Sequence, residues 1–177
     1  MRKPNALRAH LIAAVPQLRH NPDKLLVFVD EGATRCTAAQ GLSLEYSYKL
    51  NLILTDFPGS PDAVFIPLLA WLRENQHELL ANHDNNTQGI QFEVDVIDKS
   101  KVDLAITLPL TERAIVSKGA GGVLSVDYPP EPALTPHLPA TNWQLYSGAE
   151  LLAEWMSTDA EGAATEIETP HPGPRRG

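Results

Sequence analysis

The clearest pattern in the chain is an alternation of apolar and polar side chains between residues 42 and 55. The odd positions are polar except for Ile53, and every even position is apolar: Leu42, Leu44, Tyr46, Tyr48, Leu50, Leu52 and Leu54. Side chains on a strand point to opposite faces in turn, so one face of this strand is buried and the other is in water. This favours an antiparallel sheet over a parallel one, whose strands are buried on both faces.

Shorter patterns predict three further strands. The apolar run over residues 25–29 predicts a buried strand, followed by a hairpin connection or projecting loop over residues 32–41. Residues 90–96 and 102–108 alternate again and predict a hairpin. Apolar positions continue beyond Pro109, which suits an edge strand or a bulge better than a central strand.

Two segments have the spacing of amphipathic helices. Residues 4–15 carry an apolar stripe of Leu7, Leu11 and Val15, and Pro4 suits a first helical turn. Residues 61–80 follow a capping sequence, but Pro67 within them must kink the helix or delay its regular part. The fold class expected is α+β: an antiparallel sheet flanked by two helices, with an extended C-terminal arm. One core should hold Leu44, Tyr46, Leu50, Leu52, Val64, Leu68, Trp71, Leu72, Phe92, Val94, Leu104 and Ile106.

The amino-acid composition changes at Gly119, where glycines and then prolines become frequent. We therefore divide it into an α+β domain over residues 1–118, an extended arm over 119–156 and a disordered tail over 157–177. The arm ends in two apolar stretches around Ser147-Gly148-Ala149, which predict a small hairpin; a short helix over residues 148–156 is the competing interpretation.

This terminal hairpin contains several large apolar side chains, whereas the long stretch before it contains few. We expect them to anchor the arm on a neighbouring copy or on another protein instead of completing their own subunit's core. In the competing view, the hairpin docks on the exposed side of its own sheet. The candidate interface residues are Trp143, Leu145, Tyr146, Leu151 and Trp155.

The composition of the chain limits the classes of molecule that it can bind. The chain of 177 residues has 22 acidic and 14 basic side chains and a net charge of −8, which opposes nonspecific binding to nucleic acid or anionic membranes. No stretch is long and apolar enough to span a membrane, and the charged start does not resemble a secretory signal. The single cysteine, Cys36, excludes an intramolecular disulfide.

The sequence offers no catalytic, cofactor or metal site. The six histidines show no pair at helical i, i+4 spacing. Glu93 and Asp95 share one face of a strand, as a catalytic carboxylate pair would, but they sit at the solvated positions of the alternation. Neither Cys36 nor Ser147 has a nucleophile signature around it. A binding or assembly role is therefore favoured over an enzyme.

The order of several segments resembles the tail completion protein R family of P2-like phages and related prophages. The resemblance covers roughly residues 1–118, with a looser match over 143–155. It is carried by these segments: Met-Arg-Lys-Pro-Asn-Ala-Leu-Arg at the start, residues 23–29, the block 42–80 with Thr55-Asp-Phe and Leu68-Leu-Ala-Trp-Leu-Arg, Phe92-Glu-Val-Asp-Val, and Leu108-Pro-Leu-Thr-Glu-Arg. No short motif with chemical meaning is among them.

The resemblance implies a structural protein that caps the head-proximal end of a contractile tail, located in the virion and assembled in the host cytoplasm. Tail terminators, which this family resembles functionally, are rings of roughly six copies on an antiparallel sheet with flanking helices. The implied partners are further copies of the chain and the tail tube protein, with the sheath and head–tail connector proteins as further candidates. A connector or a transient assembly factor is the alternative role, and a small ligand-binding α+β domain is a third.

Overall fold

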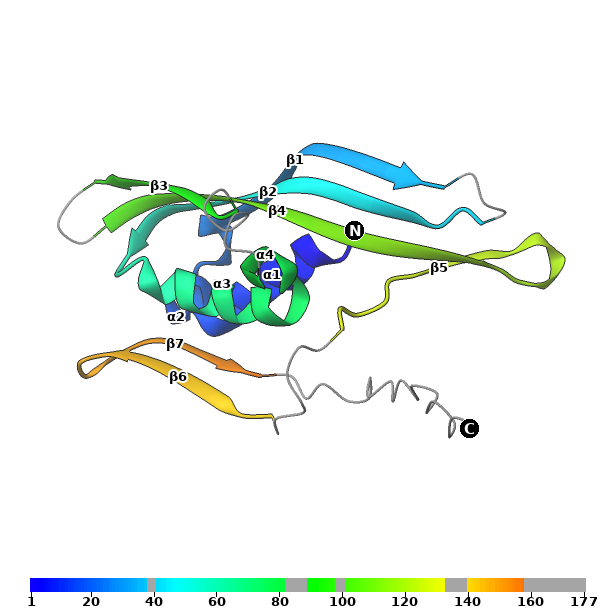
Figure 1. The fold of residues 1–177 in the computed structure, drawn as a ribbon. Coiled ribbons are helices and arrows are strands. Elements are labelled where there is room, and N and C mark those ends of the chain that lie inside the picture. The colour runs from blue at the N-terminus through cyan, green and yellow to red at the C-terminus, as the bar shows by residue number, and fades with distance from the viewer. Residues whose placement is uncertain (38–40, 82–88, 98–100, 133–139, 158–177) are drawn as a thin grey trace, which may run out of the picture.

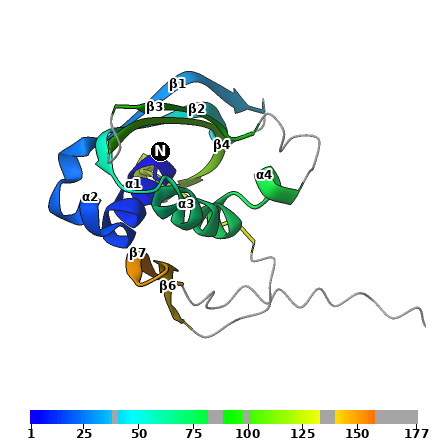
Figure 2. The same ribbon diagram turned by 90° about the vertical axis from the view of Figure 1, so that its left-hand side faces the viewer.

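The fold is a mixed α+β arrangement with a mainly antiparallel sheet, as the alternation predicts. The computed structural model describes residues 1–37, 41–81, 89–97, 101–132 and 140–157. A strongly curved sheet forms one layer, a group of helices covers part of its concave face, and a two-stranded hairpin lies on the far side of the helices (Figures 1 and 2).

The main sheet has the strand order β1-β2-β4-β3, and β5 pairs with the end of β4. Every described pairing in it is antiparallel. Its strands are β1 (Leu25–Cys36), β2 (Leu44–Pro58), β3 (Gln91–Val96), β4 (Lys101–Lys118) and β5 (Leu124–Asp127). The separate hairpin consists of β6 (Asn142–Ser147) and β7 (Glu150–Met156).

The helices form the second layer. They are α1 (Lys3–Ala14), α2 (Pro16–His20), α3 (Asp62–Asn75) and α4 (Glu78–Ala81), with short 3-10 turns η1 (Pro22–Lys24) and η2 (Ala120–Gly122). The stripe predicted for the first helix is correct, because Leu7 and Leu11 are fully buried. The chain then turns at Val15 and begins a second short helix at Pro16, which the sequence analysis did not predict.

The faces of β2 are assigned correctly, since Tyr48, Leu50, Leu52 and Leu54 are all buried. The predicted hairpin of β3 and β4 is also confirmed. Four members of the predicted core lie at its margins. Tyr46 and Val94 are half-buried and pack against it. Leu44 is only half-buried, and Phe92 is 58% exposed although its ring meets that of Phe65 edge-on with centroids 5.0 Å apart. Phe92 is exposed because β3 is an edge strand.

The first strand differs from its prediction. It continues to Cys36 instead of ending before a loop at residue 32, and the pairing with β2 shifts between Asp30 and Ala33, where Glu31 has a φ of 48°. Leu26 and Phe28 lie on the face of the sheet away from the helices, opposite Ile53 and Asn51 of β2, and are therefore exposed instead of buried. The polar composition after Val29 concealed this extension. Residues 38–40 of the predicted loop lie outside the described residues.

Pro67 and Pro109, for which the sequence analysis expected special positions, both lie within regular elements. Pro67 lies buried inside α3 and does not end it; the helix ends at Asn75, and α4 follows as a separate turn. Pro109 lies in a stretch of β4 between its pairings with β3 and β5, where β2 is the described neighbour. Two residues on, the Thr111 N–H on this open side donates to Gln76 Oε1 at 3.2 Å. The expectation of an edge strand is therefore wrong for β4 as a whole, which is central in the sheet, but Pro109 lies at a point where β4 has a described neighbour on one side only.

The start of the arm is more ordered than the sequence suggested. After a turn at Gly121 and Gly122, which have positive φ, β5 runs back along β4 and extends the sheet (Figure 1). Residues 133–139 and the predicted disordered segment from residue 158 onward lie outside the described residues.

Candidate interaction surface

The predicted interface residues all lie on the β6–β7 hairpin, which confirms the hairpin and shows the short-helix alternative to be wrong. Trp143 pairs with Trp155, Leu145 with Ala153, and Tyr146 with Leu151, with an irregularity between Leu145 and Tyr146. The two tryptophans are thus directly opposite each other across the strands.

This hairpin is part of its own subunit. Strand β7 contacts α1, α2 and α3, and Leu152 and Ala153 are buried against them. Leu145 and Trp155 pack against the same core, and Leu151 is half-buried. The expectation that the hairpin leaves its own core incomplete is therefore wrong. The competing expectation, that the hairpin docks on the sheet of its own subunit, is correct about the subunit and wrong about the site. The hairpin covers the helices and not the sheet (Figure 2).

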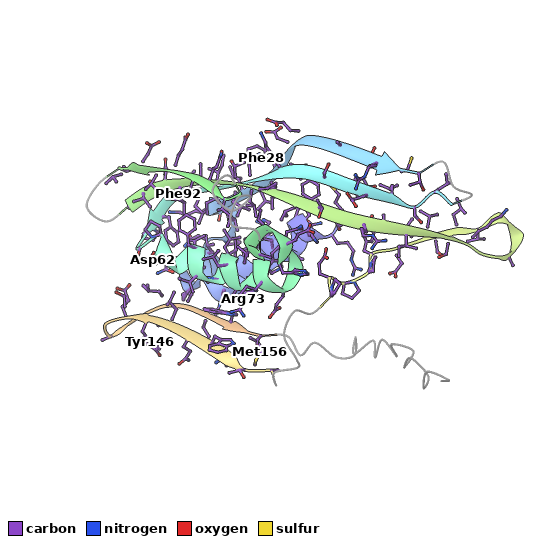
Figure 3. The ribbon with its side chains drawn as sticks, viewed as in Figure 1. Phe28, Asp62, Arg73, Phe92, Tyr146 and Met156 are labelled. Carbon is purple, nitrogen blue, oxygen red and sulfur yellow. The ribbon has the colours of Figure 1, made fainter. Side chains whose placement is uncertain are left out.

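The hairpin nevertheless keeps an exposed aromatic surface. Trp143 is 49% exposed and Tyr146 is 53% exposed. Figure 3 shows Tyr146 and Met156 on the hairpin, which lies across the helices from the sheet. Nearby, Glu154 accepts hydrogen bonds from Asn142 at 2.6 Å and from Gln144 at 3.2 Å, and these lower the pKa of its carboxyl. Trp143 and Tyr146 therefore remain candidates for contact with another molecule.

The paired tryptophans should respond differently to alanine. We expect Trp155→Ala to lower the free energy of unfolding by roughly 2–4 kcal/mol, because it removes a side chain packed on the core. Trp143→Ala should cost under about 1 kcal/mol, because half of that side chain is already in water. Urea unfolding of the two variants measures this, and equal losses would contradict the placement of the hairpin.

A buried polar cluster holds the start of α1 against the sheet. Glu112 on β4 is 4% exposed, and its Oε1 accepts hydrogen bonds from the backbone N–H groups of Arg2 and Lys3. These are N–H groups that a helix cannot satisfy internally, and no local side chain caps them. Tyr48 donates to Glu112 Oε2 at 3.5 Å, and burial together with this carboxylate raises the pKa of Tyr48.

Gln76 links the same region to the helices. Its Oε1 accepts from Lys3 Nζ at 2.8 Å, and its Nε2 donates to Glu78 Oε1 at 2.6 Å and to Thr111 Oγ1 at 3.0 Å. Lys3 Nζ also pairs with Glu131 at 2.7 Å. The sequence analysis missed Glu112, although its even number in β4 marks it as a carboxylate at a core-facing position. Its bonds to protein groups account for its burial, so we assign the cluster a structural role.

His10 is a second partly buried ionisable group. Its Nε2 lies 3.1 Å from the carbonyl oxygen of Pro67 on α3. Desolvation lowers the pKa of His10, while the bond to Pro67 and the charge of Glu74 act in the opposite direction without overcoming it. The neutral ring therefore donates this hydrogen bond between α1 and α3.

Protonation of His10 should weaken the fold. Because the pKa of His10 is lower folded than unfolded, the unfolded chain binds more protons between the two values, and stability falls as pH drops below about 6.5. The loss ends once the pH is below the folded pKa. His10→Gln should remove this part of the pH dependence. Thermal unfolding between pH 5 and pH 8 measures it, and an unchanged profile for His10→Gln would contradict it.

Within the described residues, no group of three or more His, Cys, Asp and Glu side chains could hold a metal ion. None of the helices there is long and apolar enough to cross a membrane. Glu93 and Asp95 are exposed on β3, at the solvated positions expected of them. Cys36 is exposed near the end of β1.

A groove opens at that end of the sheet. It has a volume of about 510 Å³ and is lined by Thr34, Cys36, Thr37, Gly41, Leu42, Leu44 and Tyr46. Its lining carries no carboxylate, amine or guanidinium group. A groove without convergent charged groups is a poor site for acid–base chemistry and a better surface for an apolar partner.

Comparison with known proteins decides the family. The family described as P2 phage tail completion protein R (GpR) matches residues 1–132. The chain belongs to this family. It is also 41% identical over 159 residues to Tail completion protein R of Escherichia phage P2, a match that covers 88% of this chain and 99% of the relative. No solved structure matches. The resemblance seen in the sequence is therefore confirmed. The residues that match the family contain the main sheet, the helices and the start of the arm.

Proposed function

We propose that this protein closes the head-proximal end of the tail tube of a contractile tail and forms part of the head–tail junction as a structural, non-catalytic component. The observation that carries the proposal is the likeness to Tail completion protein R, which spans 99% of that relative's length. Its partners are further copies of itself in a ring and the tail tube protein, and the sheath and connector proteins are neighbours it can reach from that position.

The surface of the molecule supports an assembly role. Strands β1, β2 and β4 extend past the helices as a thin projection (Figure 1), and apolar side chains remain exposed on it, including Leu42, Leu124 and Val126. Exposed apolar surface on a folded protein commonly marks a contact with another protein. A protein that ends a stack of rings must match the last ring on one face and present a different surface on the other.

Deletion of the coding sequence tests the proposal. Particles made without the protein should have tails of irregular length or tails without heads, as seen by electron microscopy of negatively stained lysates, and a plasmid copy should restore them. Antibody labelling of complete particles should mark the head-proximal end of the tail. Normal particles in the absence of the protein would contradict the proposal.

A transient assembly factor is the alternative function. Mass spectrometry of purified particles separates the two, because a capping protein stays in the particle at a few copies per tail and an assembly factor does not. Absence of the chain from complete, infectious particles would favour the assembly factor.

A further inference from the structure

The helices cover only the middle of the sheet. At about 3.3 Å per residue, the 18 residues of β4 span roughly 55 Å. The two long helices have 12 and 14 residues, and at 1.5 Å per residue they span only about 20 Å. The sheet therefore extends beyond its helical cover, and its two ends point in opposite directions (Figure 1).

One end, which we call the basic end, contains the ends of β1 and β4, the start of β2 and the short strand β5. Its apolar surface continues the helix-facing side of the sheet and includes the groove lined by Leu42, Leu44 and Tyr46. On the other side of β4 from β2, β5 adds exposed Leu124 and Val126. The exposed charges at this end are Arg2, Arg35, Arg113, Lys118 and Asp127, and the half-buried Glu45 is paired with Arg35 at 2.9 Å.

The other end, which we call the acidic end, contains β3, the start of β4 and the start of α3. It too carries apolar side chains on the helix-facing side, where Phe92 packs on Phe65 and Val96 is 74% exposed. Figure 3 shows Phe92 and Asp62 at this end. Its carboxylates are Asp56, Asp62, Glu93, Asp95 and Asp103, and its described cations are Lys24 and Lys101.

The arrangement of the carboxylates at the acidic end costs free energy. Asp95 and Asp103 are directly opposite each other across β3 and β4, where like charges are destabilising. Asp103 accepts a hydrogen bond from the Asp56 N–H at 2.7 Å. Among the described residues, Glu93 and Asp95 form no ion pair. A cationic partner would relieve this repulsion.

We infer that the basic end of one copy packs on the acidic end of the next, so that copies of this chain join head to tail. Each end combines exposed apolar side chains with an excess of one charge, and the two excess charges have opposite sign. A symmetric contact between two basic ends or two acidic ends would bring like charges together, which costs free energy. Repeated contacts between two different surfaces close into a ring when the rotation permits. The inference rests on the proposed function, because it names the contact by which a capping ring would form.

Charge reversal at each end tests the contact. Arg113→Glu with Lys118→Glu reverses the basic end, and Glu93→Lys with Asp95→Lys reverses the acidic end; all four side chains are exposed. Sedimentation velocity of the wild-type full chain over a concentration series should show self-association that weakens with added salt. Each double variant should raise the dissociation constant at least tenfold.

Two matched samples share the wild-type total charge and make the test specific. A chain with all four substitutions carries complementary ends of inverted sign, and it should associate within a few fold of the wild type. An equimolar mixture of the two double variants should also associate, because each reversed end then meets a complementary one. Circular dichroism should show that all variants unfold cooperatively, which separates loss of contact from loss of fold.

Wild-type protein that stays monomeric, double variants that associate like the wild type, or a mixture that does not recover would each overturn the inference. The proposed function has a separate readout. If the double variants still restore complete tails to the deletion strain, the head-to-tail contact is wrong and the capping role stands. If the deletion strain itself makes normal particles, the capping role is wrong whatever the chain does in solution.

Discussion

Replacing Leu52 with alanine should lower the free energy of unfolding by roughly 2–5 kcal/mol, the range for removing a large aliphatic side chain from a packed core. Leu52 is fully buried at the centre of β2, where it pairs with Val27 on β1 and Ile106 on β4. Its neighbours are held by two adjacent strands and a helix layer, so they cannot close around the cavity. Urea unfolding at fixed pH measures the loss.

Ile53→Ala is the matched control for Leu52→Ala. Ile53 is the next residue in the same strand and has the same number of side-chain atoms, but it lies on the opposite face and is half-buried. It should cost about half as much or less, because part of its surface is already in water. A loss below about 0.5 kcal/mol for Leu52→Ala, the size of an ordinary surface change, would mean that the two faces of the strand are reversed.

The elements that the sequence predicted well are those that local alternation determines. In β2 every second residue from Leu44 to Leu54 is apolar, so a register error would expose the whole set. The β3–β4 hairpin has the same property over shorter strands. In β1 the apolar run stops at Val29 and the strand continues through a pairing shift with small and polar residues, so the sequence did not reveal its true end.

The candidate interface shows why the remainder was not predictable. Trp143 and Trp155 are identical in type and directly opposite in the hairpin, yet Trp155 packs on the core and Trp143 is half-exposed. This difference arises because β7 makes most of the hairpin's contacts with the helices, and these contacts join residues at least 75 positions apart in the chain. Spacing within the hairpin carries no information about it.

A count of charged residues also could not predict the two charged ends. The net charge of −8 describes the whole chain, whereas the pairing of strands places Arg35 and Arg113 at one end of the sheet and Asp95 and Asp103 at the other. Strand register converts scattered charges into a polarity along the molecule. An acidic total is thus compatible with a basic end that binds an acidic one.

Glu112 is the polar side chain whose loss should cost the most stability. Its carboxylate, contributed by β4, takes the place of a local cap for α1 by accepting from the N–H groups of Arg2 and Lys3. A negative charge at this position also interacts favourably with the positive end of the helix dipole. With alanine at this position, the two N–H groups and the Tyr48 hydroxyl would lose a partner in a site where the side chain is 4% exposed.

We therefore expect Glu112→Ala to lower the free energy of unfolding by about 3 kcal/mol, because buried donors left without an acceptor cost more than the net value of an ordinary hydrogen bond. Glu112→Gln should lose less, since an amide oxygen can still accept from the backbone while the charge is gone. Glu45→Ala is the control: it removes a carboxylate whose partner Arg35 is largely in solvent, and such pairs are worth under about 1 kcal/mol. Urea unfolding gives the three values, and hydrogen exchange of the first turn of α1 should accelerate in Glu112→Ala before it does elsewhere. If Glu112→Ala costs no more than Glu45→Ala, water replaces the carboxylate at no penalty, and Glu112 is not what holds the start of α1 on the sheet.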